Sequence, residues 1–132
     1  MIAGSGDDTA TGGQGNDNVA GGLGNDALHG NDGDDTLLGG QGHDRLFGGA
    51  GNDNIYGDDD TETDYLNGGQ GNDQLHMGGN DIASGGAGSD VFYHTTQSGT
   101  AEITDFDPSV DRIVLLAQYT EFPDIQIVEH KQ

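Results

Sequence analysis

Residues 12–56 read GGQGNDNVA GGLGNDALH GNDGDDTLL GGQGHDRLF GGAGNDNIY when they are written in nines. In each nonapeptide the first two places hold Gly or Asn, the fourth holds Gly, the sixth holds Asp, and the eighth holds an aliphatic residue. A fixed period of this kind indicates one small structural unit that is stacked many times. The stretch therefore predicts a repeat architecture whose unit is nine residues long.

The repeat extends beyond this stretch in both directions. A slightly degenerate copy occupies residues 3–11, and an irregular copy with the acidic insertion DDDTETD occupies 57–67. A regular copy at 68–76, a copy at 77–84 that has lost one residue, and a regular copy at 85–93 complete the series. The sequence thus predicts a repeat domain over residues 3–93, built from ten copies.

The composition changes after the last repeat, in residues 94–132. Apolar runs at 101–106, 112–116 and 125–128 predict three short strands, and Asp107 to Ser109 predicts a turn between the first two. Repeat proteins need an atypical end, because the last repeat otherwise exposes its core and its strand edges. We expect residues 94–132 to form a C-terminal capping segment.

The charge of the chain excludes several classes of partner. There are 24 acidic residues against 3 basic ones, which gives a formal net charge of -21. Nucleic acids and anionic membranes are recognised through Lys and Arg, so neither is an expected partner. The sequence has no cysteine and no apolar run of membrane-spanning length. Polyvalent cations remain as the natural partner.

Places seven to nine of each copy are the only plausible strand, with the eighth residue pointing inward and its neighbours outward. The preceding six places must reverse the chain, which their glycines permit. The inward set is Ala10, Val19, Leu28, Leu37, Leu46, Ile55, Leu66, Leu75, Ala83 and Phe92. Two copies then make one coil, with a strand on each side, and a copy lies directly above the copy two places later. The Asp residues at the sixth place consequently stack at the strand spacing of about 4.8 Å.

This stack is unfavourable without a counterion. Two carboxylates about 5 Å apart repel by roughly 3 kcal/mol at an effective dielectric constant of 20. A hard divalent cation between successive coils reverses the sign of this interaction, and calcium suits a flexible shell of carboxylate and carbonyl oxygens. The free energy of metal binding then becomes free energy of folding.

The copies GGQGND, GGLGND, GGQGHD, GGAGND and GGAGSD resemble the repeats-in-toxin (RTX) nonapeptides of hemolysin-type calcium-binding proteins. The tail SDVFYHTTQSGTAEITDFDPSVDRIVL resembles the segment that follows the repeats in such proteins. The resemblance implies an all-β fold, a right-handed parallel β-roll of about five two-repeat coils with a C-terminal β cap. It also implies about five to eight bound Ca²⁺ ions, each between one copy and the copy two places later.

By this resemblance, each ion takes carbonyl oxygens from the second and fourth places of one copy and from the first and third places of the copy two further on. It also takes the Asp carboxylates of both copies. The implied ligands at the second and fourth places are Gly4, Gly6, Gly13, Gly15, Gly22, Gly24, Asn31, Gly33, Gly40, Gly42, Gly49, Gly51, Gly69 and Gly71. Those at the first and third places are Gly21, Leu23, Gly30, Asp32, Gly39, Gln41, Gly48, Ala50, Gly68, Gln70, Gly85 and Ala87. The carboxylates are Asp8, Asp17, Asp26, Asp35, Asp44, Asp53, Asp64, Asp73, Asp81 and Asp90.

The irregular copies leave alternatives open. The insertion before Asp64 and the deletion before Asp81 lie on the same edge, so ions at these two aspartates are in doubt. The acidic insertion is either a solvated bulge or a source of substitute ligands, namely Asp58, Asp59, Asp60 or Glu62. In the tail, Asp105, Asp107 and Asp111 either cap a turn or hold another ion. Outward apolar residues form a further feature, and three of them, Leu38, Tyr56 and Tyr93, are expected to line up as one exposed stripe, either covered by another part of the protein or free to bind a partner.

The resemblance implies a function as well as a fold. It points to a module of a larger secreted bacterial protein, exported from a Gram-negative cell by the type I secretion machinery, with the signal near the C-terminus. The module would fold on binding Ca²⁺ outside the cell, where calcium is abundant. The alternative is an extracellular module that binds a carbohydrate or a protein partner, like the repeat modules of alginate epimerases. No catalytic constellation is visible, so we expect no enzymatic activity here, although a catalytic domain upstream in a longer protein is compatible with this reading.

Overall fold

The computed structural model describes residues 1–57, 62–94, 100–115 and 124–127. Within these ranges every regular element is a strand, and the strands form two parallel sheets of seven. The odd sheet contains β1 (Ile2–Ser5), β3 (Asn18–Leu23), β5 (Thr36–Gln41), β7 (Asn54–Tyr56), β9 (Gln74–Met77), β11 (Val91–His94) and β13 (Arg112–Leu115). The even sheet contains β2 (Thr9–Gln14), β4 (Ala27–Asp32), β6 (Arg45–Ala50), β8 (Tyr65–Gln70), β10 (Ile82–Ala87), β12 (Thr100–Ile103) and β14 (Asp124–Ile127).

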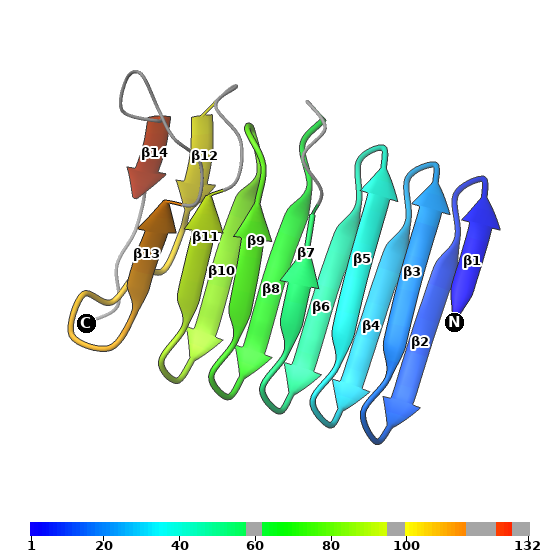
Figure 1. The fold of residues 1–132 in the computed structure, drawn as a ribbon, viewed down its shortest axis with the longest axis horizontal. Helices are drawn as coiled ribbons and strands as arrows, with labels where there is room; N and C mark the ends of the chain where they lie inside the picture. Colours follow the sequence, from blue (N-terminus) through cyan, green and yellow to red (C-terminus); the bar gives the residue numbers. More distant parts are fainter. Residues whose placement is uncertain (58–61, 95–99, 116–123, 128–132) are drawn as a thin grey trace.

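The chain passes from one sheet to the other at every turn, as Figure 1 shows, with turns along both long edges and β1 at one end of the stack. Each strand pairs with the strand one coil later, so that Val19 lies beside Leu37 and Leu28 beside Leu46. This confirms the parallel β-roll. The described residues contain no helix that is long and apolar enough to cross a membrane.

The strands that lead into a regular copy are longer than the sequence indicated, whereas β7 covers only places seven to nine. The expected strand covers places seven to nine, whereas β3 runs from Asn18 through Gly21 and Gly22 to Leu23. The first three places of the next copy therefore belong to the ladder, and only places four to six turn the chain. The reason is that a glycine in register with another glycine still donates and accepts backbone hydrogen bonds, as Gly22 opposite Gly40 does.

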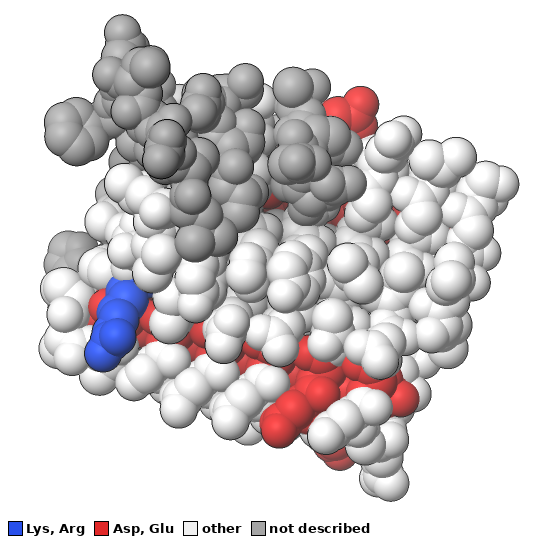
Figure 2. Space-filling view, viewed as in Figure 1, with Lys and Arg blue, Asp and Glu red and all other residues white. Residues whose placement is uncertain are grey.

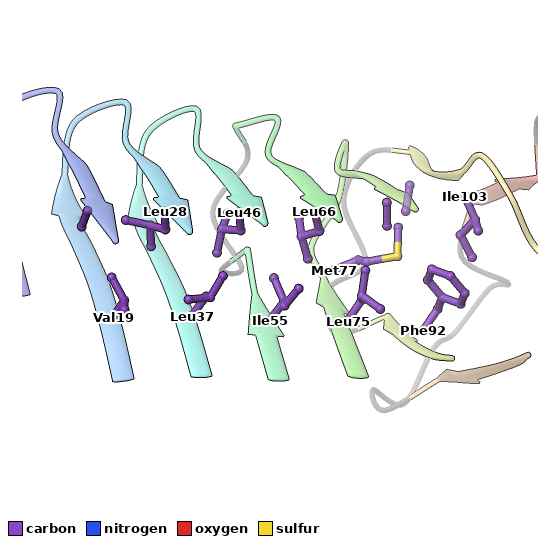
Figure 3. Close-up of a cluster of buried hydrophobic side chains, with 13 residues drawn as sticks. Val19, Leu28, Leu37, Leu46, Ile55, Leu66, Leu75, Met77, Phe92 and Ile103 are labelled. Atoms are coloured by element: carbon purple, nitrogen blue, oxygen red, sulfur yellow. The ribbon is translucent and has the colours of Figure 1, made fainter. Parts of the chain in front are cut away.

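The core is a double row of the predicted eighth-place side chains. All ten are buried, and Val19, Leu37 and Ile55 of the odd sheet face Leu28 and Leu46 of the even sheet (Figure 3). The core also includes three buried residues outside that set, which are Met77, Ala101 and Ile103. A closed apolar row between two sheets holds the turns at a fixed separation along both edges.

The three strands predicted in the tail are present at slightly different bounds. β12 begins at Thr100 and ends at Ile103, so Thr104, Asp105 and Phe106 lie outside the strand that was expected to reach 106. β12 pairs with β10, β13 pairs with β11, and β14 pairs with β12, all in parallel. The tail strands thus extend the same two sheets. A turn follows Asp107, as predicted, with the Val110 N–H donating to the Asp107 carbonyl at 3.1 Å.

Candidate metal centres

The sixth-place aspartates form a continuous ladder along each edge of the roll. One oxygen of each carboxylate accepts a hydrogen bond from the backbone N–H of the aspartate one coil earlier. The Asp17 N–H donates to Asp35 Oδ1 at 2.8 Å, and the Asp35 N–H donates to Asp53 Oδ1 at 2.8 Å. The same bond joins Asp8 to Asp26 on the opposite edge. The stack of carboxylates predicted from the period is therefore present, and it is held in place by main-chain donors.

The other carboxylate oxygen points into the roll. The Oδ2 atoms of six aspartates are buried and have no hydrogen-bond partner among the described residues; these are Asp8, Asp17, Asp26, Asp35, Asp53 and Asp73. A buried carboxylate oxygen without a partner is costly, because desolvation of the charge is not offset. The repetition of this arrangement along the roll indicates that something outside the chain is needed to satisfy these oxygens.

The first-place glycines mark where that partner fits. A Cβ built on Gly12 would lie 2.8 Å from Asp17 Oδ2 and 2.9 Å from the carbonyl oxygen of Gly30. The corresponding point at Gly21 lies against Asp26 Oδ2 and the Gly39 carbonyl, and the pattern repeats at Gly30, Gly48 and Gly68. Two oxygens from neighbouring coils therefore converge on one point that only glycine leaves open. This donor set, a carboxylate with a carbonyl, is the oxygen chemistry that Ca²⁺ prefers.

The carbonyl groups at the second, third and fourth places, which are also predicted ligands, have fixed directions. Gly13 and Gly15 have φ values of 110° and 96°, in the region that favours glycine, and the second- and fourth-place residues of the later regular copies also have positive φ values. A Cβ on Gly33 would collide with the Gly15 carbonyl oxygen, so fourth-place carbonyls face the following coil. Third-place carbonyls already accept a backbone bond, since the Gly24 N–H donates to the Gln41 oxygen at 3.0 Å. One lone pair remains on each of these oxygens.

The carboxylates by themselves do not form a metal site. Nowhere in the described ranges do three His, Cys, Asp or Glu side chains gather around one point. An ion at the convergence point must therefore draw much of its shell from backbone oxygens. This requirement agrees with a ligand pattern in which carbonyls outnumber carboxylates.

Burial raises the pKa of several of these aspartates. Desolvation raises the pKa of Asp73 to about 7 and that of Asp53 to about 6, and the negative charge of the neighbouring aspartate adds to both shifts. Desolvation also raises the pKa of Asp35. The hydrogen bond from the preceding coil acts in the opposite direction and is too weak to cancel the burial. Without a cation, the fold therefore favours protonated carboxyl groups at its centre.

The irregular copies differ from the regular ones. Asp64 and Asp81 continue one ladder, with the Asp64 N–H donating to Asp81 Oδ1 at 2.9 Å, so both changes do lie on the same edge. Asp81 Oδ2, however, accepts a hydrogen bond from the Gly78 N–H at 2.7 Å. The shortened copy thus satisfies internally an oxygen that points to an open site elsewhere. The proposed substitute ligands Asp58, Asp59 and Asp60 lie outside the described residues.

The tail aspartates act at a turn. Asp107 Oδ1 accepts the Ser109 N–H at 3.0 Å, and Asp105 accepts the N–H groups of Gly85 and Gly86. Asp111 Oδ1 accepts the Asp90 N–H at 2.9 Å, and Asp111 Oδ2 accepts the Asp107 N–H at 2.8 Å. The structure supports turn capping for Asp107 and Asp111, whereas Asp105 bonds the main chain of β10. It adds a role that the sequence did not indicate, because Asp111 extends one aspartate ladder beyond Asp90.

A second ladder, at the fifth place, was missed at the sequence level. The side-chain oxygen of a fifth-place Asn or Asp accepts the N–H of the fifth-place residue one coil later. The Asp34 N–H donates to Asn16 Oδ1, the Asn52 N–H to Asp34 Oδ1, and the Asn72 N–H to Asn52 Oδ1, each at 2.8 Å. The signal was available, because the fifth place repeatedly carries Asn or Asp. We call this set the fifth-place ladder.

The outward stripe of Leu38, Tyr56 and Tyr93 is confirmed by the strand register, which also places His76 between the two tyrosines. The His76 ring stacks on Tyr56 at a centroid distance of 4.1 Å and on Tyr93 at 4.6 Å. Burial lowers the pKa of His76. Because the three rings stack, the faces of the His76 ring are covered by Tyr56 and Tyr93.

Acidic side chains gather where the ladders run. Figure 2 shows them as a band along the edge at which the even strands end.

A family model described as the RTX calcium-binding nonapeptide repeat matches the sequence in four copies, at residues 1–28, 29–61, 38–75 and 77–98. No curated protein and no solved structure matches the chain.

Proposed function

The chain belongs to the family of RTX calcium-binding nonapeptide repeats, and from this premise we propose that its turns bind Ca²⁺ between successive coils and that this binding drives folding. Calcium binding and the β-roll are properties of the module itself. We propose in addition which residues bind each ion, that calcium binding is coupled to folding, and what role the module has in the cell. The observation that carries it is the convergence of a buried, unpartnered Asp Oδ2 with a carbonyl oxygen of the next coil, which recurs beside Gly12, Gly21, Gly30, Gly48 and Gly68.

One ion site serves as the example for the regular coils. The carboxylates of Asp17 and Asp35 would bind the ion from successive coils, together with the Gly30 carbonyl that lies beside Asp17 Oδ2. The remaining ligands would be the carbonyls implied by the resemblance, those of Gly13, Gly15 and Asp32. The bound cation supplies positive charge that offsets the repulsion within the stack of carboxylates. The chain supplies rigid turns in which glycine leaves room for the ion.

The same pattern gives sites at the other regular copies. On the edge of the example site they would pair Asp35 with Asp53, Asp53 with Asp73, and Asp73 with Asp90. On the opposite edge they would pair Asp8 with Asp26 and Asp26 with Asp44. The internal hydrogen bond of Asp81 argues against a regular site at that residue.

The experiment that tests the proposal is a calcium titration followed by far-ultraviolet circular dichroism, with ions counted by equilibrium dialysis. We expect a largely unfolded chain in excess chelator and cooperative formation of β structure at millimolar calcium, because sites of extracellular modules have Kd values of about 10⁻⁴–10⁻³ M. Magnesium at the same concentration is the control, and it should not fold the chain, because it demands a small octahedral shell. A full β spectrum in excess chelator would contradict the proposal.

We further propose that the module serves the export, folding and stability of a larger secreted bacterial protein. The physical support is the affinity range, because sites of this class stay empty at cytosolic calcium levels and fill outside the cell. Passage through the type I secretion machinery, an extracellular location, and capping of the roll by residues 94–132 belong to this proposal. Nanomolar calcium affinity would contradict it, because the chain would then fold before export.

Carbohydrate binding is less favoured. Sugars stack on the exposed faces of aromatic rings, whereas Tyr56, His76 and Tyr93 cover one another's faces. A hollow on the surface is lined by Arg45, Phe47 and Tyr65. A calcium-dependent titration with neutral and acidic glycans distinguishes this alternative from a purely structural module.

A further inference from the structure

The fifth-place ladder runs beside the aspartate ladder but in the opposite sense. In the aspartate ladder a side chain reaches back to the main chain of the coil before it. In the fifth-place ladder Asn52 Oδ1 reaches forward and accepts the N–H of Asn72, one coil later, at 2.8 Å. The next bond on this edge joins the Ser89 N–H to Asn72 Oδ1 at 2.9 Å. The turns that contain Asp34, Asn52 and Asn72 are thus bonded to the coil before and to the coil after.

The N–H group that this ladder holds belongs to the peptide between places four and five. A trans peptide is planar, so its N–H and C=O groups point in opposite directions. The Asn72 N–H is fixed on Asn52 in the preceding coil, and the Gly71 C=O must therefore point toward the following coil. The structure agrees, because a Cβ on Gly88 would collide with the Gly71 oxygen and would lie 2.9 Å from Asn72 Oδ1.

The neighbouring peptides are held by other bonds, from the Gly71 N–H to the Ala87 carbonyl at 3.1 Å and from the Asp73 N–H to Asp90 Oδ1 at 2.9 Å, and neither bond is made by the peptide group between Gly71 and Asn72. Gly71 has a φ of 115°, and glycine rotates about φ and ψ more freely than any other residue. Without the bond to Asn52, the Gly71 peptide could turn its carbonyl toward solvent. The side chain of Asn52 is exposed, so its bond is not needed to satisfy a buried group of its own.

We infer that the fifth-place ladder positions the fourth-place carbonyl oxygens for calcium. Asn52 is on this view a positioning residue: it does not touch the ion, and it aims the Gly71 carbonyl at the site between Asp73 and Asp90. Asn16 and Asp34 do the same for Gly33 and Gly51 in the coils before it. The inference rests on the proposed calcium sites and adds residues to them that the ligand pattern does not include.

The test compares Asn52→Ala with Asn52→Asp, which keeps an acceptor oxygen at the same position. Asn54→Ala is the matched control, because Asn54 lies two residues away at an outward strand position of β7. We expect Asn52→Ala to raise the calcium concentration at the folding midpoint about tenfold, as loss of a group that orients a metal ligand does. Asn52→Asp should restore the wild-type midpoint, and Asn54→Ala should retain it.

A second readout separates positioning from a general loss of stability. Carbonyl carbon chemical shifts of Gly69 and Gly71 are measured by NMR in saturating calcium and in chelator. In the wild-type chain both should shift with calcium, whereas in Asn52→Ala the calcium-induced shift of Gly71 should fall and that of Gly69 should persist. Should Asn52→Ala not fold, Asn52→Gln, which moves the amide oxygen by one methylene, is measured in the same way.

The outcomes distinguish this inference from the proposed function. An unchanged midpoint and an unchanged Gly71 shift in Asn52→Ala, with normal calcium folding of the wild-type chain, overturn the positioning role alone. Equal loss of the Gly69 and Gly71 shifts also overturns it, because the substitution would then act on the whole turn. A wild-type chain whose Gly69 and Gly71 carbonyls do not respond to calcium overturns both.

Discussion

Replacing Asp53 by asparagine separates the two roles of the carboxylate. Asparagine has nearly the same shape and keeps an oxygen that can accept the Asp35 N–H, now 2.8 Å from Asp53 Oδ1. It loses the charge, and it places an NH₂ group where Asp53 Oδ2 is buried without a hydrogen-bond partner. If the aspartate serves only as a hydrogen-bond acceptor, Asp53→Asn should be silent. If Oδ2 binds a cation, the substitution removes a ligand.

The expected effect has opposite signs in the two conditions. Breaking a buried charge pair by removing one partner costs about 3 kcal/mol or more, so the free energy of unfolding in calcium should fall by roughly that amount. In chelator the substitution removes the repulsion between Asp53 and each neighbouring aspartate, which is roughly 3 kcal/mol for carboxylates one coil apart. The metal-free chain should therefore become easier to fold, while the calcium midpoint rises.

The assay is guanidinium unfolding in millimolar calcium, followed by circular dichroism, with a parallel series in chelator and a stabilising osmolyte. Asp34→Asn is the matched control, because Asp34 is exposed and lies in the same edge of the roll, with its Oδ1 bonded to the Asn52 N–H. That variant loses the same charge and should change stability by about 0.5 kcal/mol or less. Equal effects of Asp53→Asn and Asp34→Asn would refute the reasoning, because net charge would then explain both.

Three further predictions follow from the site and the core. In chelator, lowering the pH from about 8 to about 5 should increase β structure, because burial raises the pKa of Asp53 to about 6 and that of Asp73 to about 7. The stability that these groups give is present below the unfolded pKa near 3.8 and is lost as the pH rises through 6 to 7. Calcium affinity measured by dialysis should change in the opposite direction, since protons compete for the carboxylates, and a metal-free spectrum independent of pH would contradict this. Gly12→Ala places a methyl group between Asp17 Oδ2 and the Gly30 carbonyl, so dialysis should count about one ion fewer, whereas Thr11→Ala, at an exposed strand position, should bind the wild-type number. Leu46→Ala leaves a cavity in the closed core and should cost about 2–5 kcal/mol in calcium-saturated unfolding, whereas Leu38→Ala, with the Leu38 side chain 43% exposed, should cost about 0.5 kcal/mol or less; similar losses in the two variants would show that the core does not hold the coils.

Much of the fold could be predicted from the sequence, because the place of a residue in the repeat also fixes which residue lies beside it one coil away. Once the period of nine is known, the inward residues such as Val19 and Leu28 are fixed by alternation. The alignment of Asp17 over Asp35 is fixed by two copies per coil. The oxygen-rich chemistry of the turns follows from residue type alone. These features depend only on what recurs, and recurrence is visible without coordinates.

The tertiary structure decided what depends on contacts between coils. The strands extend through Gly21 and Gly22 because backbone pairing one coil away compensates for the weak strand preference of glycine. The bond from Gly78 to Asp81 arises from the length of one shortened turn, which no period describes. The orientation of the Gly71 carbonyl depends on Asn52, a residue in another coil. In each case the deciding partner is a main-chain group brought near by stacking, and the identity of a side chain does not reveal where main-chain groups point.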